Sequence, residues 1–144
     1  MEKIKISGRS IAGLCAGAAL AGSSLWLIEA QPKQSPNFQG TVIPIDDKEG
    51  NIAHFRFEPG SRTRWHSHEK GQIILVEEGV GRTQVKGSPV IELHAGETTY
   101  AGPGVIHWHG ASPDKGGVQY NISRGGITWL EEVTDKEFSA APKR

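Results

Sequence analysis

Turn signals recur along residues 41–130 so closely that no long helix fits between them. Glycine or proline interrupts this region about every 8–12 residues, a spacing typical of β-sandwiches and small barrels. The whole chain holds 19 Gly and 8 Pro. The runs between the turns are short and rich in β-branched and aromatic residues. We therefore predict an all-β fold with strands at 41–45, 51–57, 72–78, 81–87, 89–93, 98–101, 106–110, 118–123 and 127–130.

Alternation within the run 51–57 indicates which side chains face the interior. Phe55 shares a face with Ala53 and Phe57, whereas His54 points to the opposite side of the strand. We expect the apolar face to lie inside the fold. His54 is therefore assigned to the surface.

The N-terminal residues differ in character from the rest. Three basic residues within the first ten precede a run of small and apolar residues at 11–28. This order is typical of a secretory signal peptide, and we predict that residues 1–30 are one, with cleavage after Ala30. The alternative is an uncleaved membrane anchor, because about 18 apolar residues just span a bilayer. Both interpretations predict an exported protein, periplasmic or secreted. The remaining alternative is a helix of a cytoplasmic protein.

The remainder of the chain predicts one domain. Residues 31–40 are polar and contain proline, so they are interpreted as a linker, with 41–138 as the folded domain and 139–144 as a tail. Thr134 and Glu137 form a capping-box pattern. That pattern predicts a short helix at the C-terminal end of the domain.

Charge and cysteine content narrow the possible partners and site chemistry. Sixteen basic and sixteen acidic residues cancel, so no net field attracts nucleic acid, and we expect none as a partner. The single cysteine, Cys15, lies in the predicted signal segment. A metal site in the folded domain would therefore use histidine, amide or carboxylate ligands.

Four histidines occur as two H-x-H units, one in RWHSHEKGQ and one in IHWHG. Residues i and i+2 share a face of a strand, so His66 and His68 point the same way, as do His107 and His109. A single unit of this kind is more often accidental than functional. Two units on separate strands can converge inside a barrel and surround a divalent ion, which favours a metal site.

The spacing around these histidines resembles the first motif of the cupin family, G-x5-H-x-H-x3/4-E-x6-G. Every interval is matched by Gly60, His66, His68, Gln72 and Gly79, with glutamine in place of glutamate. The family's second motif is matched in part by Gly96, Gly104 and His107, with Gly102 in place of proline and Ala111 in place of asparagine. The resemblance spans residues 41–130. It implies a single-domain, conical jelly-roll β-barrel whose metal ligands are His66, His68, Gln72 and His107.

Within the cupins, FEPGSRTRWHSHEKGQ, HWHGASP and WLEEVTDKEF resemble the small bacterial members that include manganese-dependent hydroxynitrile lyases. Those enzymes bind metal through three histidines and one glutamine. The resemblance implies manganese here, with iron, zinc or nickel as alternatives, and a homo-oligomer, dimer or tetramer. The family's presumed base, a histidine on the following strand, corresponds to Gln119, and a pocket glutamine corresponds to Ser123. A base must therefore come from elsewhere in this chain.

Gln72 has a direct chemical consequence for a bound metal. Three neutral imidazoles and a neutral amide leave a divalent ion its full double charge, half of which a glutamate would cancel. The stronger Lewis acid favours an anionic ligand such as alkoxide, enolate or cyanide. His109 is our candidate for the base, because imidazole titrates near neutral pH. The alternative is a histidine that only supports the ligands or packs in the core.

Candidate substrate-binding residues come from two strands. Gln119, Asn121 and Ser123 share one face of the strand 118–123, and we predict that this face lines the cavity. The alternative is an exposed polar face over an apolar core. Phe55, together with Ala53, is predicted to line the apolar part of the cavity, with plain core packing as the alternative. The tryptophans assigned to core or interface are Trp65, Trp108 and Trp129.

Together these residues favour a metal-dependent enzyme that acts on a small carbonyl or hydroxyl compound by lyase-type chemistry, with His109 moving the proton. A cupin dioxygenase that holds Fe(II) with the same ligands is one alternative. A cupin that binds a small molecule without catalysis is another.

Overall fold

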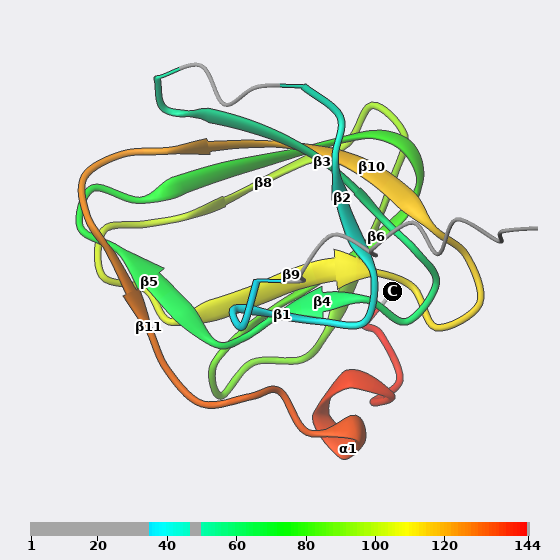
Figure 1. Cartoon of the computed structure of the whole chain (residues 1–144). Helices are drawn as coiled ribbons and strands as arrows, with labels where there is room; N and C mark the ends of the chain where they lie inside the picture. Colours follow the sequence, from blue (N-terminus) through cyan, green and yellow to red (C-terminus); the bar gives the residue numbers. More distant parts are fainter. Residues whose placement is uncertain (1–34, 47–49, 144) are drawn as a thin grey trace, which may run out of the picture. The chain divides into compact units, whose positions relative to one another are not determined.

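The longest strand, β6 (Gln72–Val85), belongs to both walls of a nearly closed antiparallel barrel (Figure 1). The computed structural model describes residues 35–46 and 50–143. One wall contains, in order, β8 (Thr98–Ala101), β6, β10 (Gly117–Ser123), β3 (Ile52–Phe57) and β2 (Val42–Pro44). The other contains β7 (Ile91–His94), β6, β9 (His107–Ala111), β4 (Arg62–Thr63) and β1 (Phe38–Gln39). Beside β9 lie β5 (His66–His68) and then β11 (Ile127–Trp129).

β6 changes from one wall to the other at Gly79. Its pairing with β10 ends at this residue, and its pairing with β9 begins at Gly81. Gly79 has φ +72°, and a Cβ atom there would lie 2.0 Å from the Gly116 carbonyl oxygen, so only glycine fits. The sequence predicted separate strands before and after Gly79. A positive φ instead bends the strand without ending it.

The other predicted strands are present with their ends moved by at most two residues, which confirms the all-β fold. The predicted linker contains β1, which pairs with β4 through Phe38 and Thr63. The predicted signal segment, residues 1–30, lies outside the described residues. No helix in the described part of the chain is both long and apolar enough to cross a membrane.

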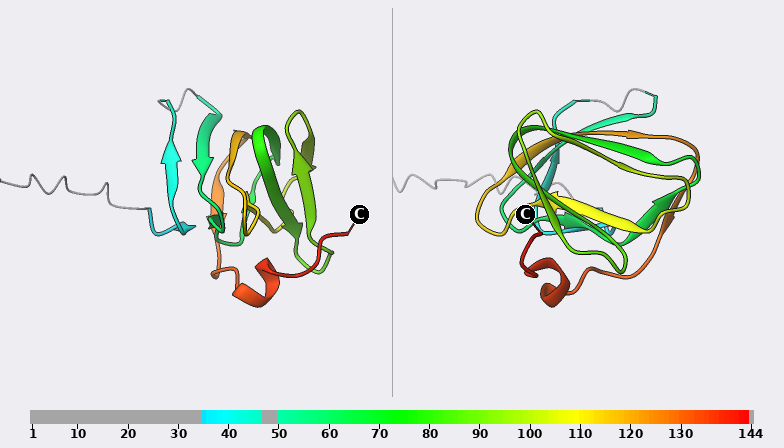
Figure 2. Two further views of the ribbon diagram at one scale, coloured as in Figure 1. Left: turned by 90° about the vertical axis from the view of Figure 1, so that its right-hand side faces the viewer. Right: turned by 180° about the vertical axis from the view of Figure 1, so that it is seen from behind.

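A short helix, α1 (Asp135–Phe138), closes the domain outside the barrel (Figure 2). Its capping box forms as predicted, with the Thr134 side chain accepting from the Glu137 backbone and the Glu137 side chain accepting from Thr134. Phe138 packs in a core cluster with Trp65, Val90, Trp108 and Val133. Trp108 therefore faces outward from β9, and the alternation of the strand turns its neighbours His107 and His109 inward.

His54 is buried, so its assignment to the surface was wrong. It lies on the outer face of β3, as expected, but its ring stacks on Tyr120 of β10 at 3.9 Å between centroids. Its Nδ1 lies 2.9 Å from Asp46 Oδ2 and its Nε2 lies 2.8 Å from Glu77 Oε2. Burial lowers the pKa of His54, but hydrogen bonds to the two carboxylates outweigh it and raise the pKa above its usual value.

Candidate metal centre and cavity

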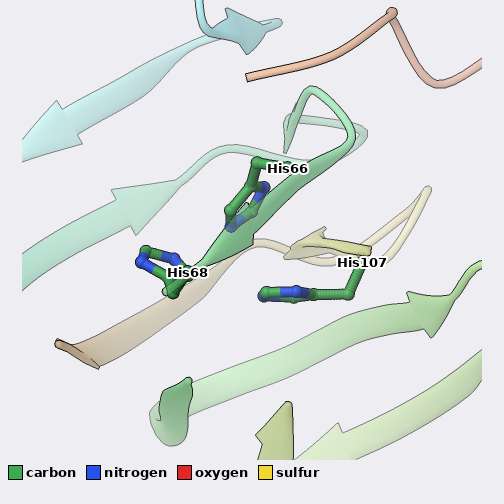
Figure 3. Close-up of side chains that lie close together, drawn as sticks. All are labelled: His66, His68 and His107. Atoms are coloured by element: carbon green, nitrogen blue, oxygen red, sulfur yellow. The ribbon is translucent and has the colours of Figure 1, made fainter. Parts of the chain in front are cut away.

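Three buried imidazoles converge inside the barrel (Figure 3). His66 and His68 project from the same face of β5, and His107 lies opposite His66 in the register of β5 with β9. One nitrogen from each ring lies within 4.8 Å of the others. The two H-x-H units therefore meet, as the sequence predicted, and place His66, His68 and His107 around one point.

Backbone carbonyls select the tautomers of two of these rings. His66 Nδ1 donates to the Arg64 oxygen at 2.9 Å, and His107 Nδ1 donates to the Val105 oxygen at 3.1 Å. A carbonyl oxygen only accepts, so Nδ1 carries the proton in both rings. Each Nε2 then presents a lone pair. Outer hydrogen bonds of this kind are the usual support of metal-binding histidines.

Gln72 completes the arrangement from the start of β6. Its Nε2 donates to Ser123 Oγ at 3.0 Å, and its Oε1 lies 2.7 Å from His107 Nε2. With the proton of His107 on Nδ1, this short contact joins two acceptors. A cation that binds both atoms satisfies them, so the donor set fits a divalent metal better than it fits a site without one.

The ring environments favour the neutral forms that a metal requires. Burial lowers the pKa of His66, opposed by its contacts with the Arg64 carbonyl and Gln72. Burial, together with the neighbouring His66, lowers the pKa of His107 to about 3. At neutral pH both rings are therefore unprotonated at the nitrogen that faces the cluster, ready to bind a cation without first losing a proton.

A cavity of about 130 Å³ opens beside the three histidines. Its polar wall contains His66, His68, Gln72, His109, Asn121, Ser123 and Thr63. Its apolar wall contains Phe38, Ala53, Phe55, Ile127 and Trp129. The cavity thus combines one polar, ligand-bearing side with an aromatic and aliphatic side, an arrangement suited to a small organic molecule.

Three residues of the apolar wall, Phe38, Ile127 and Trp129, were not predicted as cavity residues. Phe38 comes from β1 and lies edge-on to Phe55 with the ring centroids 5.4 Å apart. Trp129, assigned to core or interface, comes from β11 and lies 4.8 Å from the His66 ring. An isolated aromatic residue in the polar stretch 31–40 was the available signal for Phe38. The pairing of β11 with β5, which places Trp129, has no comparable signal in the sequence.

The polar residues of β10 face inward as predicted, but they do different things. Ser123 and Asn121 line the cavity. Asn121 Nδ2 makes a long hydrogen bond to the Gln119 oxygen at 3.5 Å, and its Oδ1 has no hydrogen-bond donor among the described residues. Gln119 is fully buried and lies behind the cavity, where it hydrogen-bonds to His109 at 3.0 Å. Phe55 lines the cavity and so does His109.

Comparison with known proteins agrees with this geometry. Residues 53–120 match the family model for the cupin domain. Over 90 residues the chain is 39% identical to the (R)-mandelonitrile lyase of Granulicella tundricola, a match covering 60% of this chain and 69% of that protein. The chain is a cupin. Its fold resembles that of a cupin-like protein from Thermotoga maritima, with a TM-score of 0.64 and 38% identity over 78% of this cupin and 93% of that chain.

A more distant structure shows the same fold. It is a conserved protein with a double-stranded β-helix domain from Klebsiella pneumoniae, with a TM-score of 0.50 and 23% identity. The match covers 71% of this cupin and 90% of that chain. The cupin motifs read from the sequence therefore identify both the family and the barrel.

Proposed function

We propose that this cupin is a metal-dependent lyase for small carbonyl or hydroxyl compounds, similar in chemistry to a hydroxynitrile lyase. The observation that carries the proposal is the convergence of three imidazoles and the Gln72 amide beside a small cavity that has one polar and one apolar wall. The lyase from Granulicella tundricola, 39% identical, supports the reaction class. Manganese is the metal that we propose first, with iron, zinc and nickel as alternatives.

The residues that would hold the metal are His66, His68, Gln72 and His107. A divalent ion at this site supplies Lewis acidity toward a substrate oxygen, undiminished by any carboxylate ligand. The chain's own groups complete the site. His109 lines the cavity and would accept or return the proton of a substrate hydroxyl. Asn121 Oδ1, which has no donor among the described residues, would accept a hydrogen bond from the substrate.

The apolar wall determines which molecules fit. Phe38, Phe55 and Trp129 surround the part of the cavity away from the histidines. They would receive the hydrocarbon part of a substrate and exclude water from it. A cavity of about 130 Å³ favours a compound with one small ring or a short branched chain.

The proposal is tested with purified full-length protein loaded separately with Mn(II), Fe(II) and Zn(II), without oxygen. Release of benzaldehyde from (R)-mandelonitrile, or cleavage of other cyanohydrins and β-hydroxy carbonyl compounds, is the expected result. Elemental analysis of His66→Ala and Gln72→Ala checks the ligands, with His94→Ala, exposed at the end of β7, as control. Turnover that requires oxygen would identify an oxygenase. Binding without turnover would identify a non-catalytic cupin.

We also propose that the protein is exported. The basic residues and apolar run at 1–30 support this location. Expression of the full-length chain with a C-terminal tag in a Gram-negative host should place it in the periplasm, the medium or the membrane fraction. Mass spectrometry then shows whether residues 1–30 are removed. Recovery of the full-length chain from the cytoplasm alone would contradict the proposal.

A further inference from the structure

We propose that Gln119 is a positioning residue that holds His109 in a single tautomer, with the proton on Nδ1 and the lone pair of Nε2 turned to the cavity. The inference deepens the proposed function, because it concerns the histidine that would move the proton. It rests on hydrogen bonds within the chain, and it can be measured without any turnover.

The orientation of the Gln119 amide is determined by a backbone acceptor. Gln119 Nε2 donates to the Gly110 carbonyl oxygen at 2.8 Å, and that oxygen can only accept. The other end of the amide, Oε1, must therefore face His109. Its distance to His109 Nδ1 is 3.0 Å, a normal hydrogen-bond length. Because Oε1 also only accepts, the proton of this bond belongs to Nδ1.

The surroundings leave the amide little freedom to turn. Gln119 is fully buried, and a Cβ atom added at Gly81 would lie 2.9 Å from Gln119 Nε2 and 2.7 Å from Val76 Cγ2. The absence of a side chain at Gly81 thus provides the space that the amide fills. A reversed amide would place its NH2 group against His109 and its oxygen against the Gly110 oxygen, losing the hydrogen bond and adding repulsion.

His109 is itself held in place. Its backbone N–H donates to Thr63 Oγ1 at 3.1 Å, and its ring lies edge-on to Phe57 with centroids 5.7 Å apart. With Nδ1 engaged by Gln119, the ring nitrogen left for the cavity is Nε2.

A direct role in substrate binding does not fit Gln119. Both ends of its amide are occupied within the protein, and its side chain is fully buried behind His109. Contact with a ligand would require both hydrogen bonds to break in a buried place and would leave buried polar groups unpaired. Gln119 thus holds His109 by a side-chain hydrogen bond, as Ser123 holds Gln72 from the same face of β10.

The test is the tautomer of His109 in the full-length protein after removal of metal with a chelator. Protein with ¹⁵N-labelled histidine is examined by long-range ¹H–¹⁵N correlation, and His109→Asn identifies the signals of this ring. We expect a protonated Nδ1 and an unprotonated Nε2 in the wild type. Gln119→Leu, which removes the oxygen that faces Nδ1, should give a mixture of tautomers.

Two results would overturn the proposal: a wild-type His109 protonated at Nε2, or an unchanged tautomer in Gln119→Leu. The first needs no variant, so poor folding of Gln119→Leu leaves the proposal testable. If the lyase assay succeeds, Gln119→Leu should lower kcat about 10- to 100-fold with KM and metal content nearly unchanged, in the range usual for lost outer-sphere partners. A negative lyase assay would leave the tautomer result standing, so the two proposals fail separately.

Discussion

Ser123 has a role that its small size conceals: its hydroxyl accepts a hydrogen bond from the Gln72 amide and keeps Oε1 turned toward His107. The sequence predicted Ser123 as a substrate-binding residue. It does line the cavity, and substrate contact remains a prediction. The observed hydrogen bond gives Ser123 a second role, which is to orient the proposed metal ligand Gln72.

We expect Ser123→Ala to weaken metal binding about 10- to 100-fold, because the amide loses the partner that orients it. Titration of metal-free protein with Mn(II) or Zn(II) against a competing chelator measures the change. Ser88→Ala, at an exposed turn, is the control and should bind as the wild type does. Equal affinities in Ser123→Ala and the control would exclude this role.

Gln72→Glu tests the charge argument at the same site. A carboxylate should bind the metal at least as tightly, but it halves the net charge of the centre and weakens its Lewis acidity. We expect full metal content and a kcat lowered by about tenfold or more, close to 1.4 kcal/mol in the barrier. Elemental analysis and steady-state kinetics separate the two effects. An unchanged kcat would show that the amide has no electrostatic role.

Individual residues differ in how far the sequence could place them. The convergence of the two H-x-H units with Gln72 was predictable, because alternation and motif spacing act within single strands. His54 was not, because its burial depends on Tyr120, Asp46 and Glu77, which come from other parts of the sheet and the turn after β2. Alternation gave the correct face of β3, but not what covers that face.

At the scale of the elements, His54 links three segments of one wall. Its strand, β3, pairs with β10, while its ring nitrogens reach Asp46 after β2 and Glu77 on β6. Both nitrogens must be protonated to donate to both carboxylates. The wall is therefore held partly by an interaction that depends on the charge of one imidazole.

This arrangement predicts a pH-dependent contribution to stability. The pKa of His54 is raised in the folded state, so its contribution is fully present below the unfolded value near 6.5 and is lost as the pH rises through the folded value. We expect His54→Gln to lose about 0.5–1 kcal/mol at pH 6, as for partly exposed ion pairs, and much less at pH 9. Urea unfolding at the two pH values measures the difference, with His94→Gln as control. A loss that is equal at both pH values would refute the prediction.

The sequence indicated where strands lie more reliably than where each strand ends or which strand it pairs with. Short alternating runs located the strands, but Gly79 was interpreted as a terminus and is a bend within β6. Likewise β1 was hidden in a polar stretch, because two residues carry too little pattern to indicate a strand. The cavity wall that β1 and β11 provide depends on such pairings, and this is why Phe38 and Trp129 were missed.

At the scale of the whole molecule, the outer face of one wall carries a row of apolar side chains. In the register of β3, β10, β6 and β8 the row runs through Ile52, Ile122, Ile73 and Tyr100. Tyr100 is 61% exposed, and Ile52 and Ile73 are also exposed. Along the strands, exposed Lys70 and Arg124 lie on one side of this row, and exposed Glu77 and Glu78 lie on the other side.

This face is where we expect the homo-oligomer to form. A two-fold axis along the row would set the basic side of one copy against the acidic side of the other. Light scattering after gel filtration should therefore give a dimer or tetramer for the wild type and a smaller mass for Tyr100→Glu. Val85→Glu, at an exposed apolar position on the other wall, is the control. A monomeric wild type, or a Tyr100→Glu variant of unchanged mass, would contradict this.

The short β1 strand has a consequence for how new substrate ranges could arise. It contributes Phe38 to the cavity, yet it joins the barrel through only two paired positions, Phe38 with Thr63 and Gln39 with Arg62. Changes at Phe38 can therefore enlarge or reshape the cavity while the other strands and the four proposed ligands stay in place. A library restricted to position 38 would sample ligand size and leave the contacts of Gln39 with Val133 in place. In evolution, substitutions at Phe38 would change the substrate range in the same way.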